Sequence, residues 1–471
     1  MDLCQLTIKQ AQEGLSKKEF SSVELVSACF KRIKQIELKI KAFITVCEKE
    51  ALEEAEKADK IISRQPLLGI PIAIKDNFST KGIRTTAGSK VLANYFPVYD
   101  ATVVSRLKKA GAIIIGKTNL DAWAHGSSGE NSDFYPTKNP WDLTMVPGGS
   151  SSGSAAAVAA GMSLAATGSD TGGSIRLPAS FCNLVGLKPT YGRVSRYGVV
   201  AMASSLDAIG HLTKTVEDSA FLLNVIAGQD GFDATMPKVK EANYVQNLDK
   251  GVKNLKIGLP KEYFQEGIDP QIKQKVLTAV KILEKLGVKA TEISLPHTQY
   301  ALATYYIICP AEISSNLARY DGIRFGNDRR SFGDEAKRRI MLGTYTLSAG
   351  YRKAYYLKSM QVRTLLKKDF DDAFKKVDII ITPVSPTLPW KLGEKIGDPL
   401  KMYLSDIFTV TANLAGLPAL AVPCGFVNTE RVELPVGMQI IGPQFSESLL
   451  FRVGYSYEQE TGWYKKKPPL A

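Results

Sequence analysis

The chain has 471 residues, 44% of them hydrophobic, enough to bury a large core in one α/β domain or in several smaller domains. Its net charge of +13 comes from 60 Lys and Arg interspersed with 47 Asp and Glu. This mixing predicts ordinary solvated faces rather than a basic block for nucleic acid or membrane. Six scattered cysteines without CxxC spacing, and no leader or apolar run of ~20 residues, predict an unexported cytoplasmic protein without a membrane span.

The first 120 residues predict helices followed by a strand–helix–strand unit. Residues 3 to about 60 are expected to form a helical hairpin, because Ser21 and Glu24 make a capping box before apolar residues at helical spacing. Residues 69–75 indicate a buried strand that ends at Lys75. A helix over 102–110 and a central strand over 112–115 follow.

The same alternation returns in the second half of the chain. Strands are predicted at 255–258, 288–293 and 377–381, with a helix at 271–286. Such alternation predicts an α/β fold with a largely parallel or mixed sheet. Residues 226–375 are more polar and helical, and we expect an excursion from the sheet rather than a separate hinged domain.

Two Gly/Ser-rich segments, 147–154 and 168–178, predict loops that bring backbone N–H groups close to a ligand oxygen. Neither contains the phosphate-binding patterns GxxxxGK[ST] or GxGxxG. Residues 149–153 fit GxSxG, but a nucleophile elbow requires a preceding strand and a downstream histidine. Residues 139–148 are predicted to be loop, and His211 and His297 have no distinctive setting.

Scarce histidine leaves lysine as the candidate base for amide hydrolysis. This reaction needs an activated nucleophile, a proton carrier and donors for the oxyanion. A lysine serves as base when burial lowers its pKa enough to make it neutral. Lys75, at the end of an apolar strand, is the best-placed candidate.

Three segments together resemble the amidase signature family: 69–77, 148–151 and 170–178, continued by 186–190. The resemblance implies one domain over 1–471, with a central mixed sheet covered by helices on both faces. Its parts are a helical part (1–60), a signature core (61–225), the excursion (226–375) and a return to the core (376–471).

The resemblance also implies a Ser-Ser-Lys catalytic triad. In this triad Ser174 is the nucleophile and Lys75 is the base. Ser150 is the relay between them and lies beside a cis peptide bond. Backbone N–H groups of Thr171, Gly172, Gly173 and Ser174 would hold the oxyanion. Asp170 and Arg176 are expected to be structural partners of the loop.

Segments 314–326, 337–343 and 413–418 resemble the glutaminase subunits of tRNA-dependent amidotransferases within this family. The resemblance implies hydrolysis of glutamine through a γ-glutamyl-enzyme. The released ammonia would be used to convert Glu-tRNA(Gln) to Gln-tRNA(Gln), or Asp-tRNA(Asn) to Asn-tRNA(Asn), or both. It also implies a heterotrimer, in which a B subunit uses ATP and Mg and binds most of the charged tRNA, and a C subunit binds the assembly together. This chain would bind no metal or cofactor. Motif matching assigns Arg339 to the glutamine carboxylate, Asp406 to its ammonium and Tyr305 to the pocket wall.

Two other functions remain open from the sequence. A stand-alone amidase for simple, aryl or fatty amides would share the triad and fold but have a more apolar acyl pocket, and would gain nothing from burying Arg339 and Asp406. In a non-catalytic scaffold we would expect at least one residue of the triad to be replaced, yet Lys75, Ser150 and Ser174 are all present.

Overall fold

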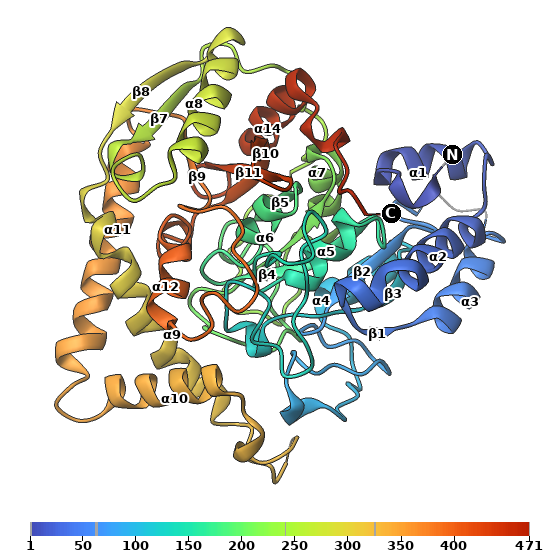
Figure 1. The fold of residues 1–471 in the computed structure, drawn as a ribbon, viewed down its shortest axis with the longest axis horizontal. Coiled ribbons are helices and arrows are strands. Elements are labelled where there is room, and N and C mark those ends of the chain that lie inside the picture. The colour runs from blue at the N-terminus through green and yellow to red at the C-terminus, as the bar shows by residue number, and fades with distance from the viewer. Residues whose placement is uncertain (1, 62–64, 241, 325, 471) are drawn as a thin grey trace.

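One mixed eleven-stranded sheet runs through the chain in the computed structural model, in the order β1-β3-β2-β4-β6-β5-β10-β11-β9-β7-β8 (Figure 1). The structure describes residues 2–61, 65–240, 242–324 and 326–470, so Phe325 of the 314–326 segment lies outside the described residues. The strands are β1 (Phe43–Val46), β2 (Pro71–Lys75), β3 (Ile113–Thr118), β4 (Ala165–Asp170), β5 (Val185–Lys188), β6 (Ala208–Thr213), β7 (Lys256–Pro260), β8 (Lys289–Ile293), β9 (Ile379–Pro383), β10 (Ala419–Asn428) and β11 (Glu433–Ile441).

Parallel pairing is confined to two parts of the sheet. Strand β2 lies parallel between β3 and β4, and β7 lies parallel between β8 and β9. Antiparallel pairs join these two parts through β6, β5, β10 and β11. Strand β2 is therefore internal, and Lys75 at its carboxyl end faces a fully buried environment.

Helices cover both faces of the sheet. They are α1 (Ile8–Ser16), α2 (Ser22–Ile40), α3 (Glu48–Ala58), α4 (Thr102–Lys109), α5 (Ser152–Ala159), α6 (Arg176–Phe181), α7 (Val216–Ile226), α8 (Pro270–Lys285), α9 (Ala301–Leu317), α10 (Asp334–Leu347), α11 (Lys358–Ala373), α12 (Pro399–Tyr403), α13 (Val410–Leu414) and α14 (Glu447–Thr461). Helices α4, α7, α8 and α14 contribute to one core, and α3, α5 and α6 to the other.

The side-chain alternation of β2 explains why both faces are covered. Ile72 and Ile74 belong to the core shared with α4 and α7, whereas Ala73 between them belongs to the core shared with α5. A strand buried on both faces is expected to be apolar at successive positions. The predicted fold class, an α/β structure with a mixed sheet between helices, is confirmed.

The N-terminal region differs from the predicted helical hairpin. The capping box at Ser21 and Glu24 begins α2 as expected. Between α2 and α3, however, β1 adds an antiparallel edge to β3. Four residues form this strand, too few for a periodic signal between two strongly amphipathic helices. The prediction of an uninterrupted hairpin was therefore wrong at 43–46.

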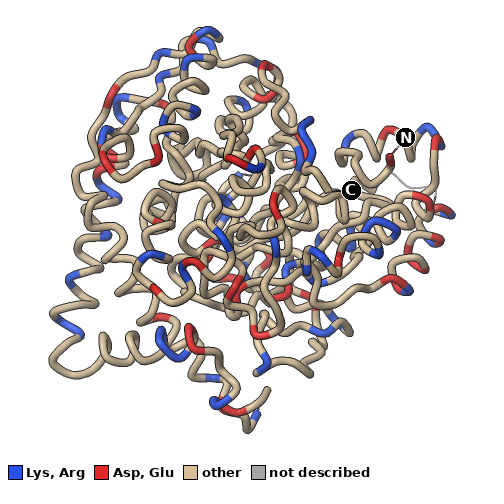
Figure 2. The backbone as a smooth tube through the Cα atoms, viewed as in Figure 1, with Lys and Arg blue, Asp and Glu red and all other residues tan. Residues whose placement is uncertain are grey.

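Charged residues are distributed around the molecule rather than gathered in one block. Figure 2 shows Lys and Arg interleaved with Asp and Glu along the helices at the edges of this view. Both termini lie on the same side of the molecule (Figure 1), and Arg32 in α2 donates to the carbonyl of Leu470. Within the described ranges, no helix is both long and apolar enough to cross a membrane.

Candidate active site at the end of strand β2

The Lys75 side-chain nitrogen lies among three serine hydroxyls. Its Nζ is 2.9 Å from the Oγ atoms of Ser150, Ser151 and Ser169. The Lys75 backbone N–H donates to Thr167 Oγ1 at 2.9 Å, which fixes the end of β2 against β4. The side chain that the sequence placed at the end of a buried strand thus reaches the Gly/Ser-rich loop 75 residues later in the chain.

Burial gives Lys75 the electrostatics of a base. Its side chain is fully buried, and this desolvation lowers the pKa of Lys75 to about 7, against an opposing influence from Asp121, Asp170 and Asp207. In the part of the chain that the structure describes, Lys75 makes no ion pair, whereas the equally buried Lys117 lies 3.1 Å from Asp76 Oδ1. A large fraction of Lys75 is therefore neutral near pH 7.

Ser150 is held in the turn that precedes α5. The peptide bond between Gly149 and Ser150 is cis, as the resemblance implied. A Cβ atom at Gly149 would lie 2.1 Å from Asp121 Oδ2, so only glycine fits here without displacing that buried carboxylate. Residues 139–148 form turns and isolated bridges, as predicted. Because no strand precedes Ser151, the turn is not the nucleophile elbow of an α/β-hydrolase.

Ser174 lies in the turn between β4 and α6, beside the Ser150 loop. The Ser151 N–H donates to the Ser174 carbonyl at 3.1 Å, which joins the two glycine-rich segments. Asp170 accepts hydrogen bonds from the N–H groups of Gly173 and Ile175 and so shapes the turn. Ser174 is 8% exposed, whereas Ser150 is fully buried. Of the two serines, Ser174 is thus the one that faces outward.

The turn leaves three N–H groups free to bind an oxyanion. Those of Thr171, Gly172 and Ser174 have no hydrogen-bond partner within the described ranges. The Gly173 N–H, which the sequence prediction counted among the donors, is 2.9 Å from Asp170 Oδ1. Gly173 instead supplies a backbone φ of +141°, which favours glycine. This position therefore serves the shape of the turn.

A buried ion pair fixes the turn from behind. Arg176 donates to both carboxylate oxygens of Asp170, at 3.1 and 3.0 Å, and also to side-chain oxygens of Asn413 and Gln439. Burial alone raises the pKa of Asp170, but the Arg176 guanidinium outweighs it and lowers this pKa to about 2. Asp170 and Arg176 thus have structural contacts of the kind that the sequence predicted.

The three residues predicted to bind glutamine lie in one cluster beside this turn. Tyr305 in α9 packs on Gly172, where a Cβ atom would be 2.6 Å from its hydroxyl oxygen. Its ring contacts Tyr306, whose hydroxyl donates to Asp406 at 2.9 Å. The Arg339 guanidinium in α10 lies 5.4 Å from the Tyr306 ring centroid. A path of direct contacts therefore runs from Gly172 to Asp406 and Arg339.

Asp406 and Arg339 are both buried and only partly neutralised. Asp406 accepts from Ser127 Oγ at 2.8 Å, and burial raises the pKa of Asp406 to about 6. Arg339 Nε donates to Glu335 at 2.7 Å. The two terminal nitrogens of its guanidinium have no hydrogen-bond partner within the described part of the chain. One anion and one cation are thus available to a ligand that carries both charges.

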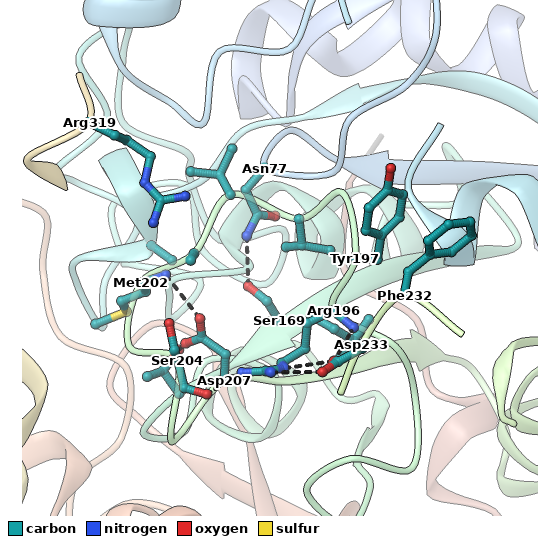
Figure 3. A pocket seen from close by; sticks show the side chains of 16 residues that line it. Asn77, Ser169, Arg196, Tyr197, Met202, Ser204, Asp207, Phe232, Asp233 and Arg319 are labelled. Carbon is teal, nitrogen blue, oxygen red and sulfur yellow. Dashed lines mark hydrogen bonds and ion pairs between the residues drawn. The ribbon is translucent and has the colours of Figure 1, made fainter. Parts of the chain in front are cut away.

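A cavity of about 240 Å³ borders the Ser174 turn on a different side. Asn77, Ser169 and Thr171 line its inner end, and Figure 3 shows the hydrogen bond from Asn77 to Ser169. The outer end carries Tyr197 and Phe232, whose rings stack at 4.5 Å. Tyr305, Arg339 and Asp406 do not line this cavity, so it is distinct from the cluster that these three residues form.

Two of the histidines have structural contacts away from Lys75. His211 is buried with Nε2 2.7 Å from Ser219 Oγ, and His297 Nδ1 lies 2.8 Å from Asp369. Among the described residues, no group of His, Cys, Asp and Glu is arranged to hold a metal ion. The third histidine, His125, is fully buried and lies two residues before Ser127, whose hydroxyl donates to Asp406.

Sequence reasoning missed several residues of the site. Ser169 precedes Asp170 in β4 and shares a strand face with Thr167, and both contact Lys75. The period-2 spacing was a usable signal for that pair. Thr409, Ser127 and Tyr306 lie in segments far from the glycine-rich loops, and only tertiary packing brings them to the site.

Comparisons with known proteins identify the family of this chain. The sequence model of the Amidase family matches residues 24–451, and the chain belongs to this family of amide-bond hydrolases. It is 55% identical to the A subunit of glutamyl-tRNA(Gln) amidotransferase from Carboxydothermus hydrogenoformans, over the full length of both chains. The crystal structure of the corresponding A subunit from Thermotoga maritima superposes with a TM-score of 0.85 at 46% identity, covering 98% of this chain and 95% of that one. The peptide amidase of Stenotrophomonas maltophilia gives a TM-score of 0.83 at 30% identity, with 98% of each chain covered.

Proposed function

We propose that this chain is the glutaminase component of a tRNA-dependent amidotransferase. The observation that carries the proposal is the 2.9 Å contact between the fully buried Lys75 amine and Ser150 Oγ, in a loop bonded to the Ser174 turn. The full-length similarity to the A subunits of such amidotransferases supports the same activity. One sheet includes strands from all four predicted parts of the chain, which supports a single domain over 1–471.

Acylation begins with proton transfer along the two serines. Neutral Lys75 accepts the hydroxyl proton of Ser150, and Ser150 accepts that of Ser174. Ser174 Oγ then attacks the γ-carbonyl carbon of glutamine. The N–H groups of Thr171, Gly172 and Ser174 stabilise the oxyanion that forms. The Gly173 N–H, bound to Asp170, holds the turn in shape.

Collapse of the tetrahedral intermediate breaks the C–N bond. The proton taken up by Lys75 returns through Ser150 to the leaving nitrogen, so ammonia departs as a neutral molecule. A γ-glutamyl ester on Ser174 remains. Water then attacks this ester with the same relay as base, and glutamate leaves.

Glutamine selectivity comes from the cluster beyond Tyr305. Arg339 binds the α-carboxylate, and Asp406 binds the α-ammonium, while Tyr305 forms the wall between them and the Ser174 turn. The contacts that support these roles are the burial of both charged groups and their common neighbour, Tyr306. A guanidinium–carboxylate pair would discriminate against amides that lack the carboxylate.

The partner proteins follow from the relatives rather than from this chain. We propose a cytoplasmic heterotrimer in which a B subunit receives the ammonia, binds most of the charged tRNA and uses ATP with Mg, and a C subunit holds the assembly together. The product is Gln-tRNA(Gln), Asn-tRNA(Asn) or both. This chain itself is proposed to use no cofactor. Six buried free cysteines suit a reducing compartment.

A stand-alone amidase remains the second candidate, since the peptide amidase of Stenotrophomonas maltophilia shares the fold. The buried charges of Asp406 and Arg339 favour the glutaminase instead, because burying them is costly unless a ligand pairs with both.

The test uses the full chain purified with its natural partners. Ser174→Ala is expected to abolish glutamine-dependent amidation of charged tRNA while leaving amidation from added ammonium salts. Ser27→Ala, at an exposed serine of α2, is the matched control for expression and assembly. Loss of both activities in Ser174→Ala would mean that Ser174 has another role.

A further inference from the structure

His125 stands apart from the other two histidines of the chain. Its side chain is fully buried, and neither ring nitrogen has a hydrogen-bond partner among the described residues. The rings of His211 and His297 each have one, in Ser219 and Asp369. A buried imidazole without partners is costly, because its polar atoms have lost water and gained nothing in return.

The segment that carries His125 connects the two halves of the proposed site. Two residues further on, Ser127 donates to Asp406 at 2.8 Å. Beyond it, the backbone nitrogens of Ser128 and Gly129 lie 2.8 and 2.9 Å from where a Cβ atom of Gly149 would be, next to Ser150. The segment that begins at His125 thus runs from Asp406 to the loop that carries Ser150.

The electrostatic setting of His125 suits a neutral hydrogen-bond donor. Burial, and secondly the Arg339 guanidinium, hold the pKa of His125 well below its usual value. The ring is therefore uncharged at pH 7, with one N–H and one lone pair. The Arg339 Nε–H donates to Glu335, so the terminal nitrogens of the guanidinium can donate to a ligand.

We propose that His125 is a specificity residue, whose ring N–H donates to one oxygen of the substrate α-carboxylate while Arg339 binds the other. The inference rests on the proposed glutaminase function and deepens it. A neutral donor completes the carboxylate site without placing a second cation beside Arg339. The ligand class is an ω-amide that carries an α-carboxylate, and binding supplies the partner that the buried imidazole lacks.

The experiment compares two substrates on the full chain assembled with its partners. Glutamine carries the α-carboxylate, and 4-aminobutanamide is the same molecule without it. His125→Leu keeps the volume of the ring without its N–H, and His125→Asn retains an amide donor. Initial rates give KM and kcat for each variant with each substrate, and the melting temperature of each variant is recorded with and without glutamine.

His125→Leu is expected to raise KM for glutamine by about 10-fold, the equivalent of one hydrogen bond to a charged group, with kcat little changed. The kcat/KM for 4-aminobutanamide should stay at the wild-type value, and His125→Asn should recover part of the affinity for glutamine. An equal loss with both substrates, or none with either, would overturn the proposal. If His125→Leu does not fold, the same comparison on His125→Met, which also lacks an N–H donor in its side chain, decides. Wild-type protein that fails to hydrolyse glutamine would instead refute the glutaminase function itself.

Discussion

The Thr409 hydroxyl donates to the Gly172 carbonyl oxygen at 2.5 Å, in the segment that follows Asp406. The Thr409 backbone N–H donates at 3.0 Å to the Asp406 carbonyl, which ties the same residue to the start of this short turn. Thr409 therefore links the turn that carries Ser174 to the backbone of Asp406, the residue proposed to bind the α-ammonium. We therefore expect this residue to influence both the proposed chemistry and the proposed recognition of the substrate.

Thr409→Val removes that link and keeps the shape of the side chain. We expect kcat/KM for glutamine to fall about 10-fold or more, because a small displacement of a positioned group costs much of its effect. KM and kcat should both change, since the residue touches both parts. Steady-state kinetics measures this, with Thr409→Ser as the control that restores the hydroxyl. A Thr409→Val enzyme with wild-type constants would show that the link has no role.

Replacing Lys75 tests the base. Lys75→Met and Lys75→Arg are both expected to lower glutaminase activity by about 10²–10⁴-fold, because methionine cannot accept a proton and arginine stays protonated. Ammonium-dependent amidation should survive. A Lys75→Arg enzyme with substantial glutaminase activity would contradict the role of a neutral amine.

The same residue predicts a pH dependence of stability. Its pKa is about 7 in the folded protein, where burial lowers it, and about 10.4 in the unfolded chain. Between these values the unfolded state binds a proton that the folded state lacks, so this residue makes the free energy of unfolding rise with pH. Lys75→Met should flatten that rise between about pH 7 and 10, as measured by denaturant unfolding. An unchanged slope would mean that Lys75 is charged in the folded protein.

The Asp170–Arg176 pair predicts a stability effect without a direct catalytic one. Arg176→Met leaves the Asp170 charge buried and unpaired, and should cost about 3–5 kcal/mol of unfolding free energy. Adding Asp170→Asn should recover part of that loss, because the uncompensated charge is gone. Chemical denaturation at pH 7 measures both variants. Equal losses in the single and double variants would argue against an ionised Asp170.

Asp406 predicts weaker glutamine binding in acid. Its pKa is raised by burial to about 6, so the carboxylate gains a proton and loses its charge as the pH falls below that value. The affinity for glutamine should therefore drop below about pH 6, and Asp406→Asn should bind weakly at every pH. Calorimetric titration of glutamine onto the Ser174→Ala protein separates binding from turnover. Wild-type affinity in Asp406→Asn would remove this residue from the ammonium site.

The sequence allowed the prediction of elements with a strong local signal. The buried strand before Lys75 and the helix at 271–286 are present as β2 and α8, within one or two residues. The antiparallel pair β10 and β11 was not predicted. Pro423 and Gly425 interrupt its pattern, and the register shifts between these same two residues. Pairing across the sheet sustains a strand that local preference does not favour.

The residues of the site likewise include some with a strong local sequence signal and some without one. Glycine-rich motifs indicated Ser150 and Ser174 as candidates, and the end of an apolar strand indicated Lys75. Ser169 and Thr409 have ordinary local sequences, and their roles depend on contacts with residues 94 and 237 positions away. The partners in such contacts are set by topology: spacing within β4 places Ser169 on the face of Thr167, but it does not show that this face meets Lys75.

Acid quenching of the enzyme during turnover tests the central claim most directly. Wild-type protein mixed with glutamine, quenched and digested with a protease, should yield a γ-glutamyl ester on the peptide that contains Ser174, detected by mass spectrometry. Lys75→Met should yield far less of it under the same conditions. An ester on Ser150 instead, or glutamate release with no esterified serine at any time point, would contradict the proposed mechanism.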